Sequence, residues 1–330
     1  MLLTHQADPA CARPRTAVAT TGRPLGPPRR RPWGKARTVF TMTPSPLAHV
    51  RGWLFDIDGV LHVGSRPVSG ASGVLGELVA RGIPFRLLTN TTTASRGTLG
   101  ARLRTMGLPI SEELLITASM ATAAYVRRRF PGVPCYLLAK GDAVDDFHEA
   151  GVPIVGPDGA PDAGVVVIGG AEDELTYARL NHAYRLLLDG ARLVAMHRNT
   201  AWRTAEGMTL DSGPFVTALA MAAGTRATVI GKPAAAFFRQ AIRDIGLPAA
   251  ELAMVGDDAR TDLGPARRLG LVGVLVRTGK PVGSAAEAQA DVVIDSVADL
   301  GPLIRAASGL KSTLEVTRHE RLESHDATSS

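Results

Sequence analysis

The chain has 330 residues, 45% of them hydrophobic, and a formal net charge of +6 at pH 7. A chain of this length can bury a sizeable core in one large domain or two modest ones. Charged residues or glycines interrupt every apolar run before it reaches the roughly 20 residues that a membrane-spanning helix needs. We therefore expect no membrane-spanning helix.

The positive charge lies in the N-terminal segment. Residues 1–41 contain eight Lys or Arg and one acid, Asp8, whereas the rest of the chain contains 29 basic and 30 acidic residues. This proline-rich segment cannot bury enough surface to offset its ordering entropy. We predict a disordered basic tail over residues 1–47, and no nucleic-acid partner for the folded part. A transit peptide and a translation start at Met42 are alternatives.

The chain contains two cysteines, Cys11 and Cys135. One falls in the predicted tail and the other in an apparent strand, so neither a disulfide framework nor a thiolate metal site is expected. This cysteine usage favours a cytoplasmic localisation.

From residue 51 the sequence alternates short apolar runs with longer stretches of helical spacing. The first run ends a strand at Phe55, and the helix after it stops at Gly82. A strand over 85–89 and a helix through 99–106 follow. Strands that alternate with helices in this way are typical of a parallel sheet in an α/β protein.

The same alternation returns near the C-terminus. We predict that four more strands complete the same sheet: 227–230, 252–255, 272–276 and 292–294. Helices are expected over 234–245 and up to Gly270.

The middle of the chain has strands and helices of its own, which indicates an inserted second domain. Its predicted strands are 136–139, 165–168 and 193–196, and its helices are 142–150 and 175–188. We therefore expect a core over residues 48–130 and 226–310, an insertion over 131–225, and a disordered tail over 311–330.

Two carboxylates, Asp56 and Asp58, follow the first buried strand, at the sheet edge where open α/β folds bind their ligands. Burying such charges costs several kcal/mol unless a cation compensates. Gly59 allows a turn beginning at Asp58, so that one carboxylate can meet a metal and phosphorus while the other faces a leaving group. An ordinary Asp-Gly hairpin turn is the alternative.

A second cluster of carboxylates, Asp257, Asp258 and Asp262, follows the predicted strand 252–255. Hard oxygen ligands of this kind suit Mg²⁺. Asp257 is best placed to bind the ion directly, Asp258 could act through water, and Asp262 could cap or brace the loop. A simple turn with a helix cap is the alternative.

Three hydrogen-bond donors also fall at strand ends: Thr89, Asn90 and Lys232. A hydroxyl, an amide and an ammonium are the groups that a phosphoryl group with developing negative charge requires. Lys232 alone would be read as a surface lysine. Together with the two clusters of carboxylates, Thr89-Asn90 and Lys232 make four segments, each at the end of a predicted strand. This combination favours phosphoryl chemistry.

These four segments, in this order, resemble the haloacid dehalogenase superfamily of phosphohydrolases, and the resemblance runs from about residue 50 to about residue 308. Segments 181–190, 213–219 and 229–233 resemble its subclass IIA. The resemblance implies an α/β fold with a Rossmannoid parallel-sheet core and an α/β C2-type cap inserted after the second motif.

The resemblance also implies roles for the site residues. Asp56 is expected to form an aspartyl-phosphate, and Asp58 to act as general acid and base. Mg²⁺ would be held by the Asp56 carboxylate, the Asp58 backbone carbonyl and Asp257. The phosphoryl group would be bound by Thr89, Asn90 and Lys232. The most similar members carry serine at the position of Asp58, so the full acid/base pair here favours ordinary phosphomonoester hydrolysis.

We therefore expect a magnesium-dependent phosphatase that acts on a small phosphorylated substrate, either a phosphomonoester or a pyrophosphate. A carbon–halogen hydrolase is a rival, but it would need neither Asp58 nor the metal cluster at Asp257. A non-catalytic protein that binds a phosphate ligand for regulation is another. The resemblance also implies a possible homodimer through the cap.

Overall fold

The structure, a computed structural model, describes residues 45–156, 163–204 and 207–305. The predicted tails therefore lie outside the described residues, except for 45–47. Here the prediction was wrong: the side chain of Leu47 is only 6% exposed and belongs to the same apolar cluster as Val50. An apolar side chain buried in this way ties the chain to the core before residue 48.

The core contains a six-stranded sheet in which every neighbouring pair is parallel. Its strands, in spatial order, are β15 (Val292–Ile294), β14 (Val272–Val276), β13 (Leu252–Gly256), β1 (Gly52–Asp56), β4 (Phe85–Thr89) and β5 (Leu115–Thr117). All five residues of β1 are buried, as expected for a strand covered on both faces. The predicted Rossmannoid core is confirmed.

Helices cover both faces of this sheet because successive side chains of a strand point to opposite sides. Phe55 of β1 packs in one apolar cluster with the helices α1 (Ala71–Ala80) and α2 (Arg96–Thr105). Its neighbour Leu54 packs in a second cluster with α7 (Ala235–Ile245) and α8 (Gly264–Arg268). A short helix, α9 (Ser284–Glu287), lies between β14 and β15 in the sequence.

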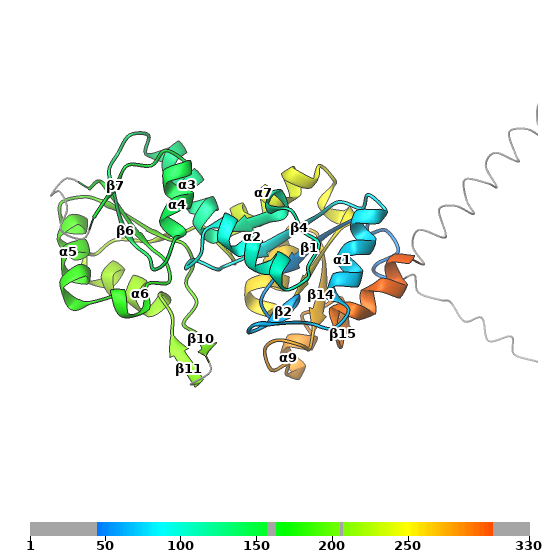
Figure 1. Cartoon of the computed structure of the whole chain (residues 1–330). Coiled ribbons are helices and arrows are strands. Elements are labelled where there is room, and N and C mark those ends of the chain that lie inside the picture. The colour runs from blue at the N-terminus through cyan, green and yellow to red at the C-terminus, as the bar shows by residue number, and fades with distance from the viewer. Residues whose placement is uncertain (1–44, 157–162, 205–206, 306–330) are drawn as a thin grey trace, which may run out of the picture. The chain divides into compact units, whose positions relative to one another are not determined.

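The inserted part has a second parallel sheet, drawn largely in green in Figure 1. Its strands, in spatial order, are β12 (Thr228–Val229), β9 (Arg192–Ala195), β8 (Val165–Ile168), β6 (Cys135–Leu138) and β7 (Ile154–Val155). Four helices accompany it: α3 (Ala118–Arg129), α4 (Ala143–Glu149), α5 (Tyr177–Leu188) and α6 (Gly213–Ala222). Among the described residues, none of the helices has the length and apolarity to cross a membrane.

An antiparallel hairpin, β10 (Ala201–Thr204) and β11 (Gly207–Leu210), extends from the inserted part (Figure 1). A second small hairpin, β2 (His62–Val63) and β3 (Arg66–Pro67), follows β1 in the core. The sequence pattern indicated neither hairpin, and it also missed β5 and α3.

One predicted strand belongs to the other sheet. The segment 227–230 was expected to complete the core sheet, but β12 pairs in parallel with β9, through Thr228 opposite Val194 and Val229 opposite Ala195. A two-residue strand adds to whichever sheet offers a free edge beside it, and its apolar pattern does not identify that edge. The chain thus leaves the second sheet immediately before Lys232.

Two carboxylates at the start of α4, Asp142 directly before the helix and Asp146 within it, cap the first turn of the core helix α2, which has no acidic residue of its own there. Asp142 Oδ1 accepts the Ser95 N–H at 3.0 Å, and Asp146 Oδ1 accepts the Arg96 N–H at 3.0 Å. The other Asp146 oxygen accepts the Ser119 hydroxyl hydrogen. Asp146 is buried, and this burial raises its pKa. These bonds tie the inserted part to the core.

We predict that Asp146→Ala lowers the free energy of unfolding by about 1–3 kcal/mol, because the Arg96 amide and the Ser119 hydroxyl lose their acceptor in a buried place. Asp145→Ala is the matched control: Asp145 lies on the same helix but is exposed. Urea unfolding of both variants is the measurement. Equal losses in the two variants would contradict the capping role of Asp146.

Candidate active site

The polar residues predicted at strand ends meet at the carboxyl ends of the core strands. We call this end of the sheet the active edge, because the candidate site lies there. Asp56 is the last residue of β1, Thr89 is the last residue of β4, and Asp257 directly follows β13. Because β1 pairs in parallel with both β4 and β13, these carboxyl ends lie side by side. Lys232, which follows β12, reaches the same edge through its ion pair with Asp56.

A buried ammonium joins two carboxylates at the centre of this edge. Lys232 Nζ lies 2.6 Å from Asp56 Oδ1 and 2.8 Å from Asp262 Oδ1. The Lys232 side chain is 3% exposed and that of Asp262 is fully buried. Lys232 is therefore not a surface lysine, and Asp262, whose role the sequence left open, is its second partner.

The pKa values at this edge reflect burial and crowded negative charge. Burial raises the pKa of Asp56 to about 6, although Lys232 opposes the shift. Burial and then the charge of Asp262 raise the pKa of Asp257 to about 6, and burial raises that of Asp262 to about 7. Burial alone would lower the pKa of Lys232, but Asp262 and Asp56 outweigh it and raise that pKa. The cluster is therefore short of positive charge.

The donor set fits a divalent cation. Asp56, Asp257 and Asp262 each offer a carboxylate oxygen, and these oxygens lie within 4.8 Å of one another. Oxygen ligands at such a site suit Mg²⁺. The set differs from the predicted one because it contains Asp262, which also pairs with Lys232. The predicted ligand role of the Asp58 backbone carbonyl stays a prediction.

Asp58 is set apart from the buried cluster. Gly59, with φ of 83°, turns the chain directly after it, as the Asp-Gly sequence allows. The Asp58 side chain is 65% exposed, and its Oδ1 lies 3.5 Å from His62 Nε2. Its Oδ2 is 3.5 Å from the hydroxyl of Thr89. Contacts this long restrain it weakly, so the carboxyl group is accessible to a bound molecule.

Asn90 holds the Lys232 backbone instead of pointing freely into the site. Its Nδ2 donates to the Lys232 carbonyl at 2.9 Å, and its Oδ1 accepts the Lys232 N–H at 2.9 Å. This pair of bonds spans the gap between the ends of β4 and β12. The geometry thus gives Asn90 a positioning role, and because a side-chain amide has two N–H donors, the predicted phosphoryl contact of its side chain stays a prediction.

Comparison with known proteins agrees with this arrangement. The sequence profile of a family described as haloacid dehalogenase-like hydrolase matches residues 53–153, and that of a HAD-hydrolase-like family matches residues 229–300. The human haloacid dehalogenase-like hydrolase domain-containing protein 2 is 40% identical over 227 residues, which are 69% of this chain and 84% of that protein. The chain belongs to the haloacid dehalogenase-like hydrolases. Within them it falls in subclass IIA.

Two further relatives resemble this hydrolase over most of their length. The human phospholysine phosphohistidine inorganic pyrophosphate phosphatase is 30% identical over 282 residues, which are 83% of this chain and 97% of that protein. The solved structure of a p-nitrophenyl phosphatase from Archaeoglobus fulgidus matches with a TM-score of 0.70 and 27% identity, over 76% of this chain and 98% of that one.

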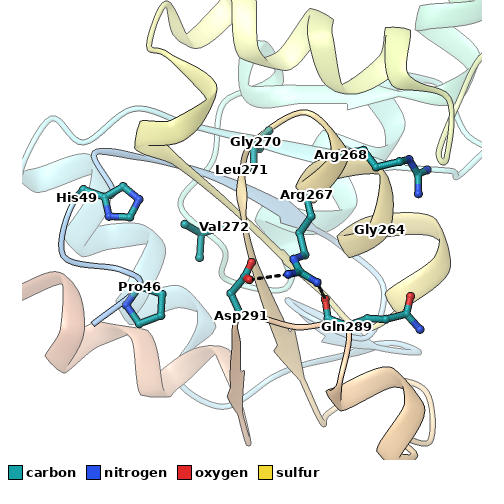
Figure 2. Close-up of a pocket in the computed structure, with 10 residues that line it drawn as sticks. All are labelled: Pro46, His49, Gly264, Arg267, Arg268, Gly270, Leu271, Val272, Gln289 and Asp291. Carbon is teal, nitrogen blue, oxygen red and sulfur yellow. Dashed lines mark hydrogen bonds and ion pairs between the residues drawn. The ribbon is translucent and has the colours of Figure 1, made fainter. Parts of the chain in front are cut away.

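A cavity of about 680 Å³ lies elsewhere on the core of this hydrolase (Figure 2). Two of the residues that line it are His49, which precedes β1, and Val272, the first residue of β14. The cavity therefore lies at the amino ends of these strands, opposite the end that carries Asp56. Its Arg267 already pairs with Asp291 at 3.0 Å and donates to the Gln289 carbonyl at 2.7 Å. The cavity is therefore separate from the candidate active site.

A further loop, residues 278–280 after β14, also lies at the active edge, although the sequence pattern did not indicate it. The Lys280 N–H donates to Asp257 Oδ2 at 3.0 Å, and Lys280 Nζ lies 2.6 Å from Asp258 Oδ2. The Thr278 hydroxyl donates to the Gly59 carbonyl at 2.5 Å. A signal was present, because these polar residues follow another strand of the same parallel sheet.

We predict that Gly279→Ala destabilises the hydrolase by about 1–3 kcal/mol, because an added Cβ would meet Asp257 Cβ and Cγ at 2.7 Å. Gly73→Ala, on α1, is the matched control. Nothing lies within 4 Å of its added Cβ, and the higher helix propensity of alanine should raise stability by about 0.5–1 kcal/mol. Urea unfolding measures both changes, and a neutral or stabilising Gly279→Ala would refute the close packing.

Proposed function

We propose that this hydrolase is a magnesium-dependent phosphatase that hydrolyses a small phosphorylated substrate through an aspartyl-phosphate on Asp56. The observation that carries this proposal is the buried Asp56 carboxylate paired with Lys232, beside an exposed Asp58. Two relatives, a pyrophosphate phosphatase and a p-nitrophenyl phosphatase, support the same reaction class by their names.

Asp56 would act as the nucleophile. The ion pair with Lys232 favours the ionised carboxylate against the effect of burial. A carboxylate oxygen attacks phosphorus, the bond to the leaving oxygen breaks, and the phosphoryl group remains on Asp56. An ammonium has three donors. Asp56 and Asp262 engage two of those of Lys232, so the third can bind a phosphoryl oxygen.

Asp58 would move the protons. In the first half of the reaction it protonates the leaving oxygen, so that the leaving group departs as a neutral alcohol. In the second half the Asp58 carboxylate takes a proton from the water that attacks phosphorus, and inorganic phosphate and free Asp56 are released. The exposure of the Asp58 side chain supports this role, because both the leaving group and water must reach it.

The ion would be held by Asp56 and Asp257, with the Asp58 carbonyl as the third predicted ligand. When bound, it supplies charge neutralisation for the phosphoryl oxygens. A charge count supports this need. When ionised, Asp56, Asp58, Asp257, Asp258 and Asp262 carry five negative charges against two positive charges on Lys232 and Lys280. An anionic substrate would be repelled by such a cluster unless a cation offset the excess.

The inserted part, which corresponds to the expected cap, limits the size of the substrate in this proposal. Gly170 of the cap donates its N–H to Thr92 Oγ1 at 2.7 Å, and His197 Nε2 lies 3.5 Å from the same oxygen. Thr92 follows Thr89 by only three residues, so the cap lies close to the proposed phosphoryl site. A small leaving group is therefore favoured over a large one.

The cap also supports the proposal of a homodimer. Several of its large apolar side chains are exposed: Tyr177, Leu188, Trp202, Met208, Leu210 and Met221. Burying such side chains is the usual driving force of association. Light scattering on the purified protein would distinguish a dimer from a monomer.

We expect Asp56→Asn to abolish release of inorganic phosphate, because an amide is not a competent nucleophile. The assay measures phosphate released from a panel of phosphomonoesters and pyrophosphate, with Mg²⁺ and with a chelator. Asp244→Asn, an exposed aspartate on α7, is the matched control and should keep full activity. Release of halide from a haloacid would favour the carbon–halogen rival. No release from any compound would favour the non-catalytic rival.

We expect Asp58→Asn to slow turnover by about 10²–10⁴-fold, with a burst when p-nitrophenyl phosphate is the substrate. The p-nitrophenolate leaving group departs without protonation, so the first half of the reaction proceeds while hydrolysis of the aspartyl-phosphate lacks its base. Stopped-flow absorbance should show a burst of about one p-nitrophenolate per active site, which is the signature of an accumulating covalent intermediate. Rapid steady turnover without a burst would contradict the role of Asp58 in the second half.

A further inference from the structure

We propose that Lys280 is a positioning residue for the divalent cation, acting through Asp257 and Asp258. This inference rests on the proposed function, because it assigns a residue of this chain to the ion site of that reaction. Lys280 lies outside the segments in which the sequence indicated site residues, but it contacts both carboxylates that follow β13.

The backbone of Lys280 fixes one oxygen of Asp257. Its N–H donates to Asp257 Oδ2 at 3.0 Å. A carboxylate with one oxygen held in this way rotates less freely, so its second oxygen keeps a defined direction. Asp257 also offers an oxygen to the cluster with Asp56 and Asp262. The Lys280 backbone therefore orients the carboxylate that is best placed to bind the ion.

The side chain of Lys280 fixes the next residue. Lys280 Nζ lies 2.6 Å from Asp258 Oδ2, while Asp258 Oδ1 accepts the N–H groups of Arg260 at 2.8 Å and Thr261 at 3.2 Å. Those amides begin the π-helical turn η4 (Ala259–Leu263), which carries Asp262. The ammonium thus connects the loop after β14 to the turn that supplies the partner of Lys232.

Neighbouring residues keep the loop in place for this task. The Thr278 hydroxyl bonds to the Gly59 carbonyl, and an added Cβ at Gly279 would collide with Asp257. Arg277, the other cation of the segment, pairs instead with Glu287 and Asp295. Lys280 is the cation that this loop directs to the active edge.

The charge of Lys280 and its proposed positioning role predict opposite changes in cation affinity when the ammonium is removed. Removing a positive charge beside the cluster would by Coulomb attraction alone tighten binding of a divalent cation. Removing the bond that steadies Asp258, and through it the turn that carries Asp262, would weaken it, because groups that orient metal ligands contribute to metal affinity. The sign of the change in affinity therefore tests positioning directly.

The experiment measures Mn²⁺ binding to the full chain without substrate, from the electron paramagnetic resonance signal of free Mn²⁺. We expect Lys280→Met to weaken Mn²⁺ binding about tenfold, the lower end of the range for groups that orient metal ligands, since the Lys280 side chain is half exposed. Lys280→Arg keeps the charge and a donor and should restore most of the affinity. Phosphate release by Lys280→Met should recover at high Mg²⁺ concentration.

Lys140→Met is the matched control. Lys140 Nζ lies 2.9 Å from both Glu172 and Asp173 on the cap, so the same substitution there breaks ion pairs away from the site. It should leave Mn²⁺ affinity unchanged. Asp258→Asn removes the partner of Lys280 but keeps an oxygen for the Arg260 and Thr261 amides, and it should weaken binding without adding to the effect of Lys280→Met.

The outcomes separate the two proposals. Unchanged or tighter Mn²⁺ binding by Lys280→Met, with normal binding by the unmodified protein, would overturn the role of Lys280 and leave the phosphatase proposal standing. A protein that binds no Mn²⁺ and releases phosphate without a divalent cation would overturn both.

Discussion

The ammonium of Lys232, buried between the carboxylates of Asp56 and Asp262, is the interaction on which the rest of the active edge depends. Two carboxylates with no cation between them would each bear a desolvation cost of several kcal/mol at this depth. The ammonium offsets that cost and leaves Asp56 ionised. Asn90 in turn holds the Lys232 backbone at both its N–H and its carbonyl, so the position of the ammonium is fixed from the end of β4.

The parallel sheet makes this convergence possible. Three neighbouring strands end at the same edge, where Asp56 and Thr89 are the last residues of β1 and β4 and Asp257 directly follows β13. The division of labour follows from depth: Asp56 is buried beside Lys232, whereas the turn at Gly59 puts Asp58 in contact with solvent. The proposed nucleophile and the proposed proton carrier, two residues apart, thus have different surroundings, which is what two roles require.

Local pattern predicted most strands of the core sheet and the carboxylates of the active edge, because apolar period and strand-end position are properties of neighbouring residues. It did not predict pairings between distant segments. The two-residue β12 joined the second sheet, Asn90 bonded to a backbone 142 residues away, and Asp262 found its partner in Lys232. For Lys280 the local signal was its place after another strand of the same sheet, and its role depends on contacts with two aspartates that follow a different strand.

The segment from Thr89 to Arg96 contacts both the cap and the residues of the active edge. At one end Thr89 and Asn90 belong to the active edge; at the other, the Arg96 amide is capped by Asp146 of the inserted part. Between them, Thr92 accepts a hydrogen bond from Gly170. A rigid displacement of the cap would therefore either break these bonds or move the residues that hold Lys232. Because Lys232 also pairs with Asp56, the position of the cap is linked through these contacts to the position of the proposed nucleophile.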